Sequence, residues 1–367
     1  RAVATIEVPA PEVFDLLLVP PEIAAGARRG FRVAGRRPLA RRRGLRIVQT
    51  YERPGFGEPE RTIETLTGQW LEAGHEVWTW LPGATSDGPP ADLPGVVCDA
   101  YPREVRPDVV VVHGGLHGAA SAGLCERMTG APVVEIVHRR RPALAGASAH
   151  VAVSRAVAAV QKAVRCAVVP PGVRVRPPQS TRAGVRSTLG IGRDDVVVVR
   201  HAEIETDKGW HWTMQVMLRV WASGLDAWLL VAGGGSGPAA AVLRAWAAGQ
   251  PRVLLESGDR RWDLLAAADL ALETSPAEGF GLAVAEAGAA GLPVVAFGTP
   301  GVAETLGRGY PTVRLGDAAG AAEALVRLAG DVGARAELGQ RLRARVARRH
   351  DPAAAARRYV SVFESLV

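Results

Sequence analysis

Apolar residues along this chain fall into short runs separated by longer segments of helical character. The runs at residues 109–112 and 133–137 are dominated by valine and isoleucine, which is typical of strands buried on both faces of a parallel sheet. Between such runs lie segments in which apolar positions recur with a helical period or alanine predominates, as at residues 60–73 and 153–164. Strands that alternate with helices in this way predict an α/β protein built on parallel sheets.

This alternation occurs twice along the chain. In the first half we predict strands at residues 45–51, 75–81, 109–112 and 133–137. In the second half we predict strands at residues 196–199, 228–232, 253–256, 270–274 and 294–297, with helices centred on Val216, Leu243, Leu264, Ala285 and Leu325. Two such halves predict two doubly wound domains, with a ligand bound where the carboxyl ends of their strands face each other.

The length of 367 residues suits two domains of ordinary size. We divide the chain into an N-terminal extension at residues 1–44, a first domain at 45–176, a second domain at 177–350 and a final segment at 351–367. The final segment contains a last predicted helix, which carries Tyr359, Val362 and Phe363 on one face. The extension is rich in proline and arginine, and we interpret it as a flexible cationic tail; a tether to a membrane surface or to another protein is the alternative.

The net charge of +7 comes almost wholly from arginine, because Lys162 and Lys208 are the only lysines. A basic balance favours anionic partners such as nucleotide diphosphates or anionic lipids, although solvated arginines from a high-GC coding bias account for most of it. The three cysteines, Cys98, Cys125 and Cys166, are scattered, which indicates a reducing compartment. No apolar run approaches the roughly 18 residues that span a bilayer. We expect a cytoplasmic protein without a nucleic-acid partner, with peripheral membrane contact as an alternative.

Two glutamates frame the start of the helix predicted after the strand at residues 270–274. Glu278 lies in a glycine-rich bend, and Glu286 follows about two helical turns later. Free amides at a helix start attract anions, so an anionic group bound there would leave both carboxylates free to accept hydrogen bonds from hydroxyls. A nucleotide sugar combines a diphosphate with such hydroxyls. The backbone amides expected to contact it are those of Gly279, Phe280, Gly281 and Leu282.

In this stretch the chain resembles the retaining glycosyltransferases of family 4, which have the GT-B fold of two doubly wound, Rossmann-like domains facing across a cleft. In that family two glutamates are separated by seven residues, as Glu278 and Glu286 are here. The resemblance extends from about residue 45 to the C-terminus. Further matching segments are, in order, residues 74–77, 107–113, 132–138, 152–154, 168–173 and 207–209. The resemblance implies sugar transfer from a nucleoside diphosphate sugar, with retention, to an acceptor that the sequence does not specify. Because the chain offers no obvious nucleophile, we expect front-face attack with the diphosphate as base.

The resemblance also assigns roles to individual residues. It implies that Glu286 binds the ribose hydroxyls and that Glu278 contacts the donor sugar. It places His138, which follows the strand at residues 133–137, against the sugar or the phosphate. Lys208 would stabilise the negative charge that grows on the leaving diphosphate. Residues 177–350 would thus hold the donor, residues 45–176 would hold most of the acceptor, and residues 351–367 would cross back to the first domain.

One position departs from the family pattern. The family's arginine usually lies about five residues before the lysine, but Glu203 stands there in this chain. We therefore take Arg200, at the end of a strand, as the second candidate cation for the diphosphate. The alternative is that Arg200 is a strand-end surface charge.

Three glycines complete the expected donor site. Gly55 and Gly57 follow the first strand, where the family places glycines close to the donor phosphates, and Gly301 lies in a second loop that enters a helix. His113 and His117 have a spacing that could suggest a metal, but no carboxylate cluster accompanies them. We expect neither a metal nor a cofactor, the nucleotide sugar being a co-substrate.

Other functions remain open at this point. The glycines at residues 233–237 follow a strand and invite a dinucleotide-binding interpretation, but Pro238 stands where the fingerprint requires its last glycine. A dehydrogenase is therefore a distant alternative. A nearer one is a GT-B nucleotide-sugar epimerase, which needs no acceptor. Outside enzymes, the displaced arginine suggests a partner subunit that binds nucleotide sugars without catalysis.

Overall fold

The computed structural model describes residues 44–51, 58–81, 94, 96–98, 105–113, 129–143, 146–161 and 166–367. The extension at residues 1–43 and the predicted donor contacts Gly55 and Gly57 lie outside the described residues, as does His117. None of the described helices is long and apolar enough to cross a bilayer.

The N-terminal half of the described chain forms a sheet of seven strands in the order β3-β2-β1-β4-β5-β6-β7, all paired in parallel. Its strands are β1 (Arg46–Thr50), β2 (Glu76–Trp80), β3 (Val96–Cys98), β4 (Val109–His113), β5 (Val133–Val137), β6 (Ala149–Ala152) and β7 (Cys166–Val168). Its helices are α3 (Glu58–Glu72) and the short α5 (Arg155–Ala158). Every residue of β4 and β5 is buried, as their apolar composition predicts.

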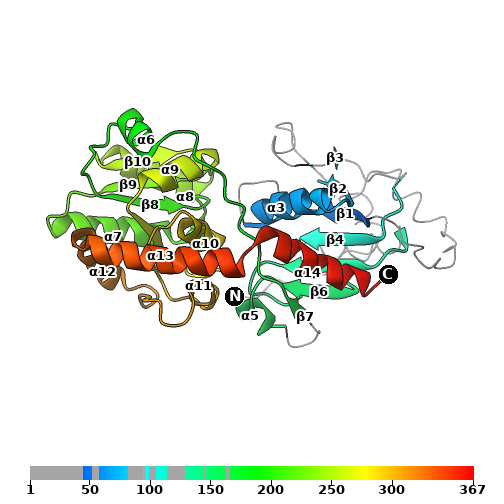
Figure 1. The fold of residues 1–367 in the computed structure, drawn as a ribbon. Helices are drawn as coiled ribbons and strands as arrows, with labels where there is room; N and C mark the ends of the chain where they lie inside the picture. The colour runs from blue at the N-terminus through cyan, green and yellow to red at the C-terminus, as the bar shows by residue number, and fades with distance from the viewer. Residues whose placement is uncertain are drawn as a thin grey trace.

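The C-terminal half forms a second parallel sheet of five strands, in the order β10-β9-β8-β11-β12. Its strands are β8 (Val197–His201), β9 (Trp228–Ala232), β10 (Val253–Glu256), β11 (Leu270–Glu273) and β12 (Val294–Ala296). Its helical elements are α6 (Arg182–Thr188), the 3-10 turn η1 (Thr206–Lys208), α7 (Trp210–Ala222), α8 (Pro238–Ala248), η2 (Gly258–Arg260), α9 (Arg261–Ala267), α10 (Leu282–Ala289), α11 (Pro300–Leu306), α12 (Ala318–Gly330) and α13 (Val332–Arg349). Figure 1 shows the two halves side by side.

Both sheets are doubly wound, as the sequence predicts. In the first sheet the strand order reverses between β1 and β4, and in the second it reverses between β8 and β11. Ligands of such sheets bind outside the carboxyl ends of the strands at these reversal points. The segments that follow β1, β8 and β11 are therefore the first places to look for a site.

Strands β3, β6 and β7 were not predicted, and the structure also differs from the prediction in three helices. The helix predicted at residues 153–164 is limited among the described residues to α5, which begins after the side chain of Ser154 caps the backbone N–H of Val157. Helices α6 and α13 were not predicted. Helix α13 buries only Gly339, Leu342 and Val346, so its apolar face is too narrow to stand out in an arginine-rich segment.

The last helix, α14 (Pro352–Glu364), returns to the N-terminal sheet and packs on α3 (Figure 1). The side chain of Asp351 caps its first turn by accepting from the N–H of Ala354. Tyr359 and Phe363 are fully buried, and their rings contact the edge of Trp70 at centroid distances of 6.4 and 5.5 Å. Such aromatic packing ties the end of the chain to the first domain.

Replacing Phe363 by alanine should lower the free energy of unfolding by roughly 3–5 kcal/mol, because it removes a fully buried aromatic ring and leaves a cavity beside Trp70. Chemical denaturation measures this loss. Ser361→Ala, on the exposed face of the same helix, is the matched control and should change stability by no more than about 0.5 kcal/mol. A loss below about 1 kcal/mol for Phe363→Ala would contradict this packing.

Candidate functional site

A cavity of about 370 Å³ lies between the two domains. The first domain lines it with Tyr51 after β1, with the start of α3 and with the segment that follows β5; the second lines it with the segments that follow β8 and β11. These are the carboxyl ends of the strands, where the topology predicts a ligand. The size is in the range of small-molecule sites.

Lys208 and Glu278 meet at this cavity. Lys208 ends η1, and its Nζ donates to Oε1 of Glu278 at 2.9 Å. Gly209 follows in the left-handed region with φ 66°, and a Cβ there would collide with the carbonyl oxygen of Thr274. Burial alone lowers the pKa of Lys208, but Glu278 and other carboxylates outweigh burial and hold this pKa above its usual range. The lysine is therefore charged, and the structure brings together the two residues predicted for the sugar and the phosphate.

Arg200 is not brought to the cavity. It is fully buried in β8, and its guanidinium donates to the hydroxyls of Thr213 and Thr274 and to the carbonyl oxygen of Lys208. Its Nη2 also lies 3.6 Å from Oε1 of Glu273. The expected contact with a diphosphate is thus not available to Arg200, nor is Arg200 the surface charge of the alternative interpretation. It instead holds the Lys208 turn against the end of β11.

The glycines at the predicted helix mouth allow close approach of backbone segments. A Cβ on Gly279 would collide with the carbonyl oxygen of His138, and a Cβ on Gly301 would collide with those of Glu278 and Gly279. Gly281 has φ 85° and is the N-cap of α10. The hydroxyl of Ser154 donates to the carbonyl oxygen of Gly279 at 2.5 Å. The glycine-rich loop is therefore packed directly against the first domain.

Two of the predicted nucleotide contacts offer only their backbone. Phe280 is 1% exposed, and its ring packs edge-on against His350 at a centroid distance of 4.9 Å. Its carbonyl oxygen accepts from the hydroxyl of Thr305. Leu282 is also buried, and it begins α10. The Leu282 N–H, at the helix start expected to bind an anion, stabilises the carboxylate of Glu58 from the first domain.

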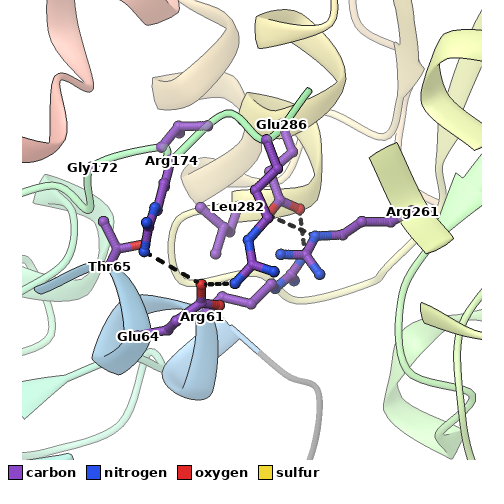
Figure 2. Close-up of a pocket in the computed structure, with 10 residues that line it drawn as sticks. Arg61, Glu64, Thr65, Gly172, Arg174, Arg261, Leu282 and Glu286 are labelled. Atoms are coloured by element: carbon purple, nitrogen blue, oxygen red, sulfur yellow. Dashed lines mark hydrogen bonds and ion pairs between the residues drawn. The ribbon is translucent and has the colours of Figure 1, made fainter. Parts of the chain in front are cut away.

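Glu286 is held by two arginines and a histidine rather than facing the large cavity. Arg61 of α3 reaches it from the first domain and donates from Nη1 to Oε2 (Figure 2). The Nε2 of His201 lies 3.1 Å from the same oxygen, and the Nε of Arg261 lies 3.4 Å from Oε1. Burial alone raises the pKa of Glu286, but these groups lower it to about 2. The side chain of Arg61 therefore occupies the position in which ribose hydroxyls were expected.

His138 ends a chain of buried polar side chains. The amide nitrogen of Gln49 donates to the hydroxyls of Thr67 and Thr79, so its oxygen accepts from Nε2 of His113 at 3.3 Å. The Nδ1 of His113 then accepts from Nε2 of His138 at 3.1 Å. This sequence of donors leaves Nδ1 of His138 as a buried acceptor without a partner among the described residues, beside the cavity. His138 is thus set to accept a hydrogen bond from a ligand hydroxyl.

Several of these residues could not be selected from the sequence. Arg61 and Gln49 occur in ordinary helix and strand patterns, so no local signal marks them. His113 ends a buried strand just as His138 does, and that shared position was the available clue. Glu203 was noticed because it stands where the family has arginine, and the structure places it at the cavity.

Acid should destabilise the folded protein through its buried histidines. Burial lowers the pKa of His138 to about 3 and that of His350 to about 4. The unfolded chain takes up these protons first, near pH 6.5, so stability falls as the pH drops from 6.5 towards 4. A shift of the size found for His350 corresponds to about 3 kcal/mol. Unfolding of the wild type and of His350→Leu across this pH range should show a shallower loss for the variant; parallel curves would contradict it.

Comparison with known proteins agrees with this arrangement. Residues 194–331 match the family model described as glycosyl transferases group 1. No curated protein matches the chain in sequence. Among solved structures, HepE of Anabaena in complex with UDP and glucose is similar with a TM-score of 0.74 at 17% identity, covering 88% of this chain and 100% of that chain.

Two further structures share the architecture. A glycosyltransferase from Rickettsia africae has a TM-score of 0.73 at 15% identity, covering 88% of this chain and 98% of that chain. The sucrose-phosphate synthase from Thermosynechococcus elongatus has a TM-score of 0.68 at 16% identity, covering 88% of this chain and 99% of that chain. The predicted GT-B fold is thereby confirmed, and the match to the group 1 glycosyltransferase model lies within the second domain.

Proposed function

We propose that this group 1 glycosyltransferase moves a sugar from a nucleoside diphosphate sugar to a hydroxyl acceptor, with retention of the anomeric configuration and without a metal ion. The observation that carries the proposal is the meeting of Lys208 and Glu278 at the interdomain cavity, inside the segment that matches the family. HepE of Anabaena has been crystallised with UDP-glucose, so a uridine diphosphate sugar is the first donor to test.

The proposed chemistry breaks the bond between the anomeric carbon and a phosphate oxygen. Negative charge grows on the leaving diphosphate, and the ammonium of Lys208 stabilises it. Glu278 positions that ammonium and is placed to accept hydrogen bonds from the hydroxyls of the donor sugar. In front-face attack the acceptor hydroxyl gives its proton to the leaving phosphate oxygen, on the face from which that oxygen departs. The second domain would close on the first to exclude water.

His138 would act on the donor sugar from the first domain. Its unpartnered Nδ1 would accept a hydrogen bond from a sugar hydroxyl. The contacts with His113 and Gln49 fix the tautomer in which this nitrogen is an acceptor. The low pKa of His138 keeps the ring neutral at pH 7. His138 therefore orients the sugar and does not serve as a cation for the phosphates.

A thermal-shift screen with UDP-, GDP- and ADP-glucose tests donor use directly. A rise in melting temperature with one nucleotide sugar, and slow hydrolysis of that donor without an acceptor, are the expected results. Proton NMR of the freshly released sugar, recorded before mutarotation, should show the α anomer from an α-linked donor. Release of the β anomer would overturn retention, and the absence of any nucleotide-dependent shift would overturn the function.

A second function is favoured by one observation. Because Arg200 is buried and Glu203 lines the cavity, the described site carries fewer cations for a diphosphate than the family pattern implies. A partner subunit that binds nucleotide sugars without catalysis has this property. The hydrolysis measurement separates the two functions, since such a subunit would show the thermal shift but no sugar release.

A further inference from the structure

Two carboxyl groups line the interdomain cavity from opposite domains. Glu60 belongs to α3 of the first domain, and Glu203 follows β8 of the second. Among the described residues neither forms an ion pair. The cations nearest to them have other partners: Lys208 binds Glu278 at 2.9 Å, Arg139 binds Asp207 at 2.8 Å, and Arg61 binds Glu286.

One carboxyl oxygen of Glu60 lacks a hydrogen-bond donor among the described residues. The residue is only 9% exposed, and its Oε2 is buried with no hydrogen-bond partner among the described residues. Buried polar oxygens are almost always satisfied by a donor, because burying a polar group without a hydrogen-bond partner is costly. Since Glu60 lines the cavity, the missing donor is one that a ligand brings.

Acidic side chains outnumber cationic ones among the residues that line the cavity. Six carboxyl groups line it: Glu58, Glu60, Glu203, Glu205, Asp207 and Glu278. Four cationic side chains line it as well, and three of them are bound to carboxylates. No group of three acidic, histidine or cysteine residues in the described part of the chain could hold a metal ion. An organic cation fits this lining.

We propose that Glu60 and Glu203 together bind a protonated amine of the acceptor, so that the acceptor is a hydroxylated amine such as an amino sugar or an aminocyclitol. This inference rests on the proposed function. The ammonium would bridge the two domains between the start of α3 and the segment after β8. It would also lie near the donor diphosphate, where it offsets negative charge that the buried Arg200 cannot reach. A cavity of about 370 Å³ admits a ring of this size.

The electrostatics of the pair agree with this occupant. Burial and the neighbouring Glu203 raise the pKa of Glu60 to about 8, and burial and Glu205 raise the pKa of Glu203. Arg61 opposes both shifts, Lys208 and Arg139 oppose that of Glu203, and the hydroxyl of Tyr51 stabilises the Glu60 carboxylate. An ammonium placed between the two carboxyls would favour their charged forms. Binding of the amine should therefore release protons near neutral pH.

The experiment measures binding of 2-deoxystreptamine, a ring with two amines and three hydroxyls, to the full chain by isothermal titration calorimetry, with and without UDP. The matched probe is its di-N-acetyl derivative, which keeps the ring and loses the charges. We expect the diamine to bind at least 10-fold more tightly. Glu60→Gln and Glu203→Gln should each weaken the diamine about 10-fold and leave the diacetyl probe unchanged. The control is Glu323→Gln, an exposed position on α12.

Each result bears on the proposal. Titrations at pH 7.5 in phosphate and in Tris should reveal proton release on diamine binding, and less of it in Glu60→Gln. Equal affinity for the two probes, failure of either to bind, or diamine binding that both glutamine variants retain would overturn the amine site. Should Glu60→Gln fail to fold, the half-buried Glu203→Gln decides the question. The proposed function is judged separately, because the thermal shift with nucleotide sugars needs no acceptor.

Discussion

Replacing Lys208 by alanine should reduce the turnover of sugar transfer, or of donor hydrolysis, by roughly 10²–10³-fold. Loss of one preorganised donor to a developing negative charge typically has this effect. In the structure Lys208 is the cation of the second domain that faces the cavity, because the guanidinium of Arg200 is used within the fold. Glu278 holds the Lys208 ammonium in place at 2.9 Å, so little reorganisation is needed during the reaction.

The measurement is a steady-state assay of nucleotide release with the donor that the thermal-shift screen identifies. Lys208→Arg keeps the charge and should retain more activity than Lys208→Ala. Arg219→Ala removes an exposed cation from α7 and serves as the control for net charge. Circular dichroism and melting temperature check that the variants are folded. If Lys208→Ala keeps more than about a third of the wild-type turnover, the assignment of Lys208 is wrong.

Replacing Glu286 by glutamine should have the second largest effect, on both donor affinity and stability. The change removes the carboxylate that lies between Arg61, His201 and Arg261. Removing one partner of a buried ion pair costs about 3–5 kcal/mol, because the remaining charges lose their counter-ion. The ribose hydroxyls would also lose their expected acceptor, and nucleotide affinity should fall at least 10-fold. Chemical denaturation and titration with nucleotide measure the two losses separately.

Arg61 provides the opposing test for Glu286. The guanidinium of Arg61 donates to the Glu286 carboxylate that the ribose hydroxyls are expected to use (Figure 2). Bound nucleotide must therefore displace the Arg61 side chain. Arg61→Met should therefore bind nucleotide more tightly than the wild type, although it loses the interdomain ion pair. Arg174→Met is a suitable control, because Arg174 lines the pocket drawn in Figure 2 together with Arg61 and lies near Glu64 rather than Glu286. Weaker nucleotide binding by Arg61→Met would show that Arg61 assists the donor rather than competing with it.

Much of the fold was predictable because its signals are local. Buried parallel strands need continuous apolar runs, and β5, β9 and β10 have the bounds that their sequences predict. Helix α13 escaped prediction because long polar side chains cover most of its surface and few residues are buried. Glu278 and Lys208 could be selected in advance because the short segments that contain them resemble motifs of family 4 glycosyltransferases.

Whether each site residue is buried, paired or exposed to the cavity was decided only by tertiary contacts. Arg200 and Lys208 look alike in sequence as cations near one loop, but Arg200 points into the core between β8 and β11 while Lys208 faces the cavity. Arg61 and Glu286 are 225 residues apart, and Glu60 and Glu203 belong to different domains. The sequence by itself determined the two doubly wound sheets and the charged residues at their strand ends, because apolar periodicity and turn chemistry act over a few neighbouring residues. Which charges pair, which are buried and which remain open to a ligand depends on distances between segments far apart in the chain, and only the packing of the two domains determines those distances.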